Sequence, residues 1–238
     1  MAHQILKDCR FWVDQYDLSG DANSHRATFT QEAVNATTFG NAGAHTYLPG
    51  LKGASHQHSM FFDADGVDAP FDALSANSEM IVSLTPATDV EGGASLLYQS
   101  INSQFTPLEG TVGDMANFQL TGTVTGPVVG GVILAPKAAR TTSTNTTGFE
   151  VGAVAAGRSV YAALHVFSGT ASTLAVKVQS DTVGFASPTD RITFATATPS
   201  TNLAQFSSAA GAITDTYWRA IWTIAGGTWT FAVTLGIT

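Results

Sequence analysis

The chain has 238 residues, enough for one large β domain or two smaller ones with a substantial buried core. Hydrophobic residues make up 44% of the chain and charged residues 12%, with 23 Gly and 32 Thr, which is typical of a β-rich protein with few surface charges. This composition excludes intrinsic disorder, and no apolar run is long enough to predict a transmembrane helix, so we expect no membrane partner.

Charge divides the chain into two parts. Residues 1–126 hold 14 acids and 4 bases, whereas residues 127–238 hold 4 acids and 6 bases. The composition also changes at Gly126-Pro127, which predicts one domain over 1–126 and a second over 127–238. The acidic first part argues against a surface that reads nucleic acid, because phosphate contacts need clustered Lys and Arg. Dispersed carboxylates that maintain solubility are the simpler interpretation.

Two features near the N-terminus bear on its compartment and its stability. Residues 1–20 carry charges and no apolar signal-peptide core, so we expect synthesis in a cytoplasm. The single cysteine, Cys9, cannot form an internal disulfide. Stability is therefore expected from packing or from assembly with other subunits.

The acidic part reads as strands interrupted by one long loop and one short helix. Alternating residues at 9–15 and 24–30, around Asp17–Gly20, predict an N-terminal β-hairpin. The Gly- and Pro-rich stretch 31–53 predicts a long loop, and loops of that length are usually functional or interfacial. Asp68 before Pro70 predicts a short helix to about residue 76. Further strands are expected at 54–62, 79–85, 95–105 and 115–125.

The second part predicts an antiparallel β-sandwich. Its strands are expected at 128–135, 158–167, 173–180, 191–196, 216–224 and 228–237, with a polar loop at 139–148. In the last two strands, alternation places aromatic side chains on a core face, and Ala225-Gly226-Gly227 predicts a turn that pairs these strands as a hairpin. The expected core residues are Trp218, Trp222, Trp229 and Phe231.

Motifs that would carry chemistry are incomplete. His56 and His58 project from one face of a strand, which is half of a metal site, but no third ligand follows at a recognised spacing. Asp63–Asp68 resembles a calcium loop without its closing Glu, so a solvated turn is favoured. His165 lies in an apolar strand and reads as a core or interface histidine. Nucleophile-elbow, phosphate-loop and paired-carboxylate patterns are missing, so we expect no enzyme, metal or cofactor.

Four motifs in the acidic part resemble tail-tube proteins of tailed bacteriophages. They occur in the order found in that family, over about residues 10–125: Asp17-Leu18-Ser19-Gly20, Thr37-Thr38-Phe39-Gly40, Leu48-Pro49-Gly50-Leu51-Lys52 and Phe61-Phe62-Asp63. The C-terminal aromatic strands are similar to a β-sandwich segment of phage structural proteins. The resemblance implies a mainly β fold, with a tail-tube-like sandwich or barrel domain that includes one short helix, followed by a jelly-roll-like antiparallel sandwich.

The resemblance also implies a function and partners. Copies of the chain would form rings, hexameric by family analogy, that stack into a tail tube and contact other tail or head proteins of the virion. DNA would pass through the lumen without specific binding, and an acidic lumen would repel its backbone. The loop at 31–53 would reach a neighbouring ring, with the contact residues Phe39, Gly40, Asn41, His45, Tyr47, Pro49, Gly50, Leu51 and Lys52.

Two other functions fit the sequence. A capsid decoration or receptor-binding module would use the C-terminal sandwich, with the first part as its anchor. A carbohydrate-active enzyme or lectin would use a jelly-roll scaffold. Hollow polymers would favour the tube over a decoration protein, and a carboxylate pair in a cleft would favour the enzyme.

Overall fold

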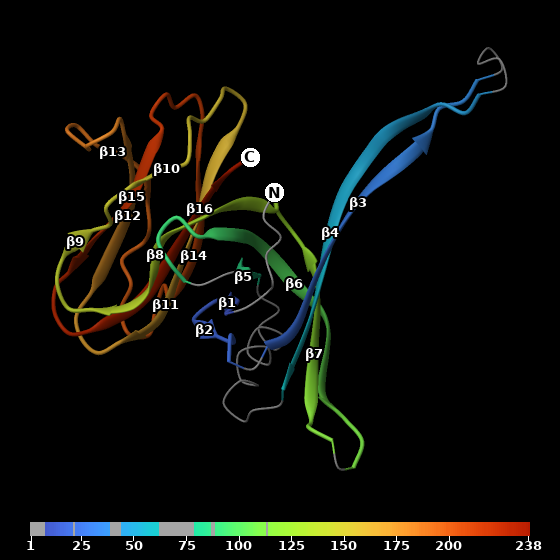
Figure 1. Ribbon diagram of the computed structural model, residues 1–238, viewed down its shortest axis with the longest axis horizontal. Coiled ribbons are helices and arrows are strands. Elements are labelled where there is room, and N and C mark those ends of the chain that lie inside the picture. Colours follow the sequence, from blue (N-terminus) through green and yellow to red (C-terminus); the bar gives the residue numbers. More distant parts are fainter. Residues whose placement is uncertain (1–7, 21, 39–43, 62–78, 87–88, 113) are drawn as a thin grey trace.

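A computed structural model describes residues 8–20, 22–38, 44–61, 79–86, 89–112 and 114–238 (Figure 1). The described residues form antiparallel β-sheets without a helix, so the expected mainly β, sandwich-like fold is confirmed. The short helix expected at 68–76 lies outside the described residues. The structure describes no helix with the length and apolar character needed to cross a lipid bilayer.

Sixteen strands make up the described structure. In chain order they are β1 (Arg10–Val13), β2 (Tyr16–Asp17), β3 (Ala22–Asn35), β4 (Tyr47–Phe61), β5 (Met80–Thr85), β6 (Ala94–Glu109), β7 (Asn117–Val124), β8 (Val129–Arg140), β9 (Thr144–Asn145), β10 (Phe149–Glu150), β11 (Ser159–Gly169), β12 (Leu174–Asp181), β13 (Thr189–Thr193), β14 (Ala204–Ala210), β15 (Tyr217–Ile224) and β16 (Trp229–Ile237).

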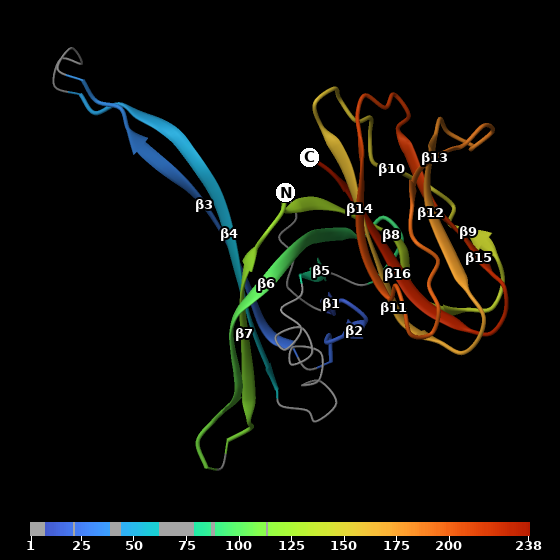
Figure 2. The ribbon, with the colours of Figure 1, turned by 180° about the vertical axis from the view of Figure 1, so that it is seen from behind.

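The strands form two sheets. The larger has eleven strands with the path β14-β11-β16-β8-β6-β5-β1-β2, and the strands β3, β4 and β7 branch from β6 in the order β3-β4-β7-β6. The smaller has five strands, β10-β15-β12-β13 with β9 beside β15, and it covers the β14-β11-β16-β8 part of the larger sheet as a sandwich (Figure 2).

The sandwich core is aromatic and lies between the two sheets. Trp218 and Trp222 come from β15 in the small sheet, whereas Trp229 and Phe231 come from β16 in the large one, and all four are buried in one cluster. The predicted hairpin of these two strands is therefore wrong. β15 pairs with β12, and β16 pairs with β8 and β11, because the turn at 225–227 crosses between sheets instead of reversing within one.

The predicted N-terminal hairpin is also wrong. β1 pairs with β2 and β5, while β3 pairs with β4 over nearly its whole length. Residues 31–35 and 47–53, expected in a loop, extend β3 and β4 into a long two-stranded ribbon. The loop predicted from Gly and Pro is wrong for these residues because cross-strand pairing overrides the local signals, and Pro49 is tolerated because that part of β4 is an edge.

Strand β8 connects the two parts of the chain. Its first residues pair with β6, and from Gly131 onward it pairs with β16 in the sandwich. One continuous sheet therefore contains strands from both sides of the composition boundary at residue 126. The division into domains at 1–126 and 127–238 stays a prediction.

Candidate assembly interface

The β3–β4 ribbon projects far from the rest of the molecule (Figure 1). Its far end is closed by hydrogen bonds from the amide of Ala36 to the carbonyl of Thr46 (2.8 Å) and from the amide of Thr46 to Thr37 Oγ1 (3.0 Å). Beyond the reach of β7, which pairs with β4 only from Ser55 onward, two strands stand alone. An isolated two-stranded hairpin is marginally stable in water, so this segment needs a covering partner.

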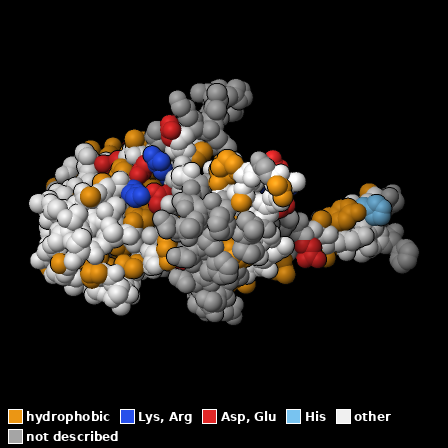
Figure 3. All heavy atoms as spheres, turned by 90° about the horizontal axis from the view of Figure 1, so that it is seen from below, with side chains coloured by type: hydrophobic (Ala, Val, Ile, Leu, Met, Phe, Trp, Pro, Cys, Tyr) orange, Lys and Arg blue, Asp and Glu red, His pale blue; other side chains and the backbone are white. Residues whose placement is uncertain are grey.

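Apolar side chains gather on this ribbon, as Figure 3 shows toward its far end. In the part of the ribbon beyond β7, the exposed large hydrophobic residues are Phe29, Val34, Tyr47, Leu48 and Leu51, the last with 82% of its surface exposed. Register distributes them over both faces of the ribbon, with Val34 opposite Leu48 on one face and Phe29 on the other. Large apolar side chains exposed together on a soluble protein usually mark an interaction site.

The predicted contact residues lie partly on this ribbon. Tyr47, Pro49, Gly50, Leu51 and Lys52 belong to β4, and all but Gly50 are exposed. His45 lies just before β4, with its ring 6.2 Å from that of Tyr47. Phe39, Gly40 and Asn41 lie outside the described residues. Sequence reasoning missed Phe29 and Val34, which lie on opposite faces of β3 and could have been found only once that segment was recognised as a strand.

The sheet that carries the ribbon has two open edges. Among the described residues, β3 pairs only with β4, which leaves its other edge free. On β6, the pairing with β5 ends at Ser100, and beyond it no strand of the described part of the chain pairs with that side of β6, while β7 occupies the other side. Unpaired strand edges present rows of N–H and C=O groups that pair readily with another chain.

The face of this sheet turned away from the core carries mostly hydroxyl and amide side chains. Register places three rows of neighbours across its four strands: Ser24, Ser59, Gln119 and Thr106; Arg26, Gln57, Thr121 and Gln104; and Thr28, Ser55, Thr123 and Ile101. Arg26 is the one charged side chain in these rows, and the carboxylate of Glu109 lies beside them, where it accepts from Gln119 Nε2 (2.5 Å). An acidic lumen wall stays a prediction.

A buried polar network joins the two parts of the molecule. His165 on β11 contacts the carbonyl of Asp14 through Nδ1 (2.7 Å) and Ser83 Oγ through Nε2 (2.8 Å), and Ser83 contacts Thr234 Oγ1 (3.0 Å). Because a carbonyl only accepts, Nδ1 carries the proton and Nε2 accepts from Ser83. Burial lowers the pKa of His165 to about 4, which keeps the ring neutral.

This network does not form a catalytic site. Ser83 and His165 are fully buried, and the second nitrogen of the imidazole bonds to a backbone carbonyl instead of a carboxylate. The interpretation of His165 as a satisfied interior histidine therefore agrees with its contacts. An ion pair between Lys137 Nζ and Asp17 Oδ2 (2.5 Å) lies beside it, and although burial raises the pKa of Asp17, hydrogen bonds from Lys137 and Ser19 lower it overall.

No metal site is found in the described ranges. No group of three or more His, Cys, Asp or Glu there has a geometry that could hold a metal ion. His56 and His58 instead lie side by side in the interior with His25. The Asp63–Asp68 segment lies outside the described residues.

Comparisons with known proteins give distant structural similarities. No protein-family model and no curated protein matches the chain. It is similar to a chain of the virion of a native gene transfer agent particle (18% identity, TM-score 0.43) and to one from the tail of an empty gene transfer agent particle (19%, 0.43), each match covering 53% of this chain and 97% of the other. It is also similar to the SPP1 Dit protein, described as a hub adsorption apparatus protein of phages that infect Gram-positive bacteria (13%, 0.40, 98% and 100% covered). TM-scores below 0.5 do not establish a shared fold.

Proposed function

We propose that the protein is a non-enzymatic structural subunit of a tailed-phage-like particle that assembles with copies of itself. The observation that carries the proposal is the four-stranded sheet β3-β4-β7-β6, which is open at both ends and extends into an unsupported apolar ribbon. The tail-tube resemblance of the sequence motifs supports the class of particle. The proposed location is the virion, with assembly in the host cytoplasm.

The strand directions favour a ring. Each neighbouring pair in β3-β4-β7-β6 is antiparallel, so β6 runs opposite to β3. When the free edge of β6 in one copy lies beside the free edge of β3 in the next, the antiparallel alternation continues. Such a head-to-tail contact closes into a ring when the rotation between copies allows it. We propose that six copies close the ring, by analogy with the family.

In this arrangement the face of the sheet turned away from the core lines the channel. Its hydroxyl and amide side chains would offer passing DNA no cation cluster that binds phosphate, and the carboxylate of Glu109 beside them would repel the backbone. The exposed ribbon would then reach a neighbouring ring and bury its apolar side chains there.

The proposal is tested by electron microscopy of the purified protein over a concentration series, with Leu51→Asp as the test variant. We expect hollow rings or tubes for the natural chain and at least a tenfold higher concentration for their formation in Leu51→Asp. Leu51 is exposed in the single copy, so the variant should keep its melting temperature.

The matched control is Val183→Asp, which places the same charge at an apolar position 72% exposed on the sandwich. This variant should polymerise as the natural chain does. Dispersed single copies at all concentrations would contradict self-assembly and would favour the decoration or receptor-binding module.

A further inference from the structure

Three histidines are packed together where the ribbon joins the body. His25 lies on β3 opposite His58 on β4, and His56 follows on the same face of β4. The ring centroids of His25 and His58 are 4.3 Å apart, and those of His56 and His58 are 4.7 Å apart. Phe11 of β1 stacks on His58 at 4.0 Å, so the cluster lies between the ribbon and the core.

The cluster is built for neutral imidazoles. His25 Nδ1 and His58 Nδ1 are 2.7 Å apart, a hydrogen bond in which one nitrogen donates and the other accepts. If both rings were protonated, both nitrogens would donate and the bond would be lost. The remaining nitrogens of the three rings are buried without a partner, so no acceptor stabilises an added proton.

No described acid forms an ion pair with any of the three rings, although Asp8 and Arg10 line the pocket beside His25. From β1 it meets Phe11, from β6 Tyr98, and from β7 Gly122, where a Cβ would lie 2.2 Å from His56 Nε2. Tyr98 is the one titratable side chain among these, and burial raises its pKa, so it stays neutral. Arg26 projects from the opposite face of β3. Burial lowers the pKa of His25 and of His56 to about 4, and that of His58 well below its usual value.

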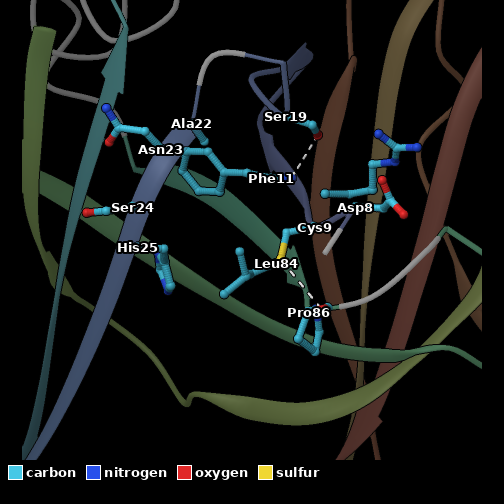
Figure 4. Close-up of a pocket in the computed structure, with 11 residues that line it drawn as sticks. Asp8, Cys9, Phe11, Ser19, Ala22, Asn23, Ser24, His25, Leu84 and Pro86 are labelled. Atoms are coloured by element: carbon cyan, nitrogen blue, oxygen red, sulfur yellow. Dashed lines mark hydrogen bonds between the residues drawn. The ribbon is translucent and has the colours of Figure 1, made fainter. Parts of the chain in front are cut away.

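Solvent reaches the cluster from the side of His25. His25 lines a pocket of about 380 Å³ between β1, β3 and β5, together with Phe11 and Leu84 (Figure 4). Protons can therefore enter without prior unfolding of the sandwich.

We propose that His25, His56 and His58 form a proton-sensitive joint, which holds the β3–β4 ribbon on the body at neutral pH and releases it in acid. Each imidazolium would repel its neighbours within a stack in which no described acid is paired with a ring, and opening the joint exposes the rings to water. A consequence, which rests on the proposed function, is that assemblies made through this sheet dissociate in acid while the sandwich stays folded.

The test is hydrogen exchange of backbone amides in the full chain, kept as single copies at low concentration, from pH 7 to pH 4. We expect the opening equilibrium of β3, calculated from protection factors, to rise by up to about 1,000-fold per pH unit, because opening takes up as many as three protons. At a pH at which the amides of β3 lose their protection, the amides of β16 should stay protected. In the double variant His25→Phe and His58→Phe, which keeps aromatic stacking, the rise should be at most about 10-fold per pH unit.

The matched control is His45→Phe, which changes a histidine on the same ribbon outside the cluster and should behave as the natural chain does. Equal pH dependence of β3 in the double variant and the natural chain would overturn the proposal. So would simultaneous loss of β3 and β16.

If the double variant fails to fold, a second measurement on the natural chain tests the proposal. NMR titration of the natural chain should show the three rings remaining neutral until β3 opens. Rings that titrate near pH 6.5 while β3 stays protected would overturn the joint. Both measurements use single copies of the chain. Their outcome therefore does not depend on whether the subunits assemble into rings.

Discussion

Trp222 shows how single residues hold the sandwich together. Its indole Nε1 donates to the carbonyl of Thr142 (3.0 Å), its ring meets Phe231 edge-on at 5.4 Å, and the guanidinium of Arg140 lies 4.8 Å from its centroid. Phe231 belongs to the facing sheet, so this one side chain connects both layers. Aromatic pairs and a cation over an indole add to the burial of apolar area.

Replacing Trp222 with Ala should therefore lower the free energy of unfolding by about 3–5 kcal/mol, because it leaves a cavity between the sheets. The measurement is urea unfolding followed by circular dichroism. Trp222→Phe, which keeps most of the contact with Phe231, should lose less. A midpoint unchanged in Trp222→Ala would place the side chain outside the energetically important core.

At the scale of elements, sequence patterns located most strands but not their partners. Alternation of Trp218, Ala220 and Trp222 correctly marked a buried face, since a strand has a period of two whatever it pairs with. Pairing depends on contacts distant in the sequence, and a three-residue turn is compatible with either a hairpin or a crossing between sheets. In both wrong hairpin predictions, the strands were expected to pair with their neighbours in sequence, whereas β3 and β15 pair with other strands.

The candidate interface was also predictable only in part, because local patterns do not specify which strands pair. The motif at Leu48–Lys52 pointed to the correct segment, but the Gly and Pro residues there suggested a loop. The exposed apolar side chains of β3 and the histidine cluster follow from the β3–β4 register, which no local signal specifies. The acidic composition of residues 1–126 likewise does not say which face the carboxylates occupy.

The pairing of β8 with β16 provides a test of how tightly β8, the strand that also pairs with β6, is held in the sandwich. A Cβ at Gly131 would lie 2.0 Å from the carbonyl oxygen of Leu235, a backbone atom that no rotamer change can move. Gly131→Ala should lower the free energy of unfolding by about 1–3 kcal/mol. The neighbouring Gly130, where a Cβ meets nothing within 4 Å, is the matched control. Equal thermal stability of the two variants would show that the β8–β16 pairing tolerates a side chain at residue 131.

At the scale of the whole molecule, buried histidines make stability depend on pH. The pKa values of His25, His56 and His165 fall to about 4 and that of His58 falls further, so the unfolded chain binds more protons than the folded one below pH 6.5. Asp14 acts oppositely, since burial raises its pKa to about 6 and the folded state holds its proton.

The net difference near pH 5 is about three protons, which corresponds to a loss of stability of about 4 kcal/mol per pH unit as the pH falls. Urea unfolding at pH 7, 6 and 5 measures this slope. The stability contributed by the histidines is complete above pH 6.5 and declines toward pH 4. A constant free energy of unfolding over this range would contradict the buried, neutral state of the four rings.

The position of β8 determines how the molecule responds to mechanical load. Because β8 is bonded to β6 near its start and to β16 along the rest, a pull on the sandwich in the strand direction loads these hydrogen bonds together, in shear. Bonds loaded in shear must break as a group, whereas bonds peeled from one end break singly. Tension along this direction is therefore transmitted from the sandwich to the sheet that carries the ribbon without a compliant hinge between them.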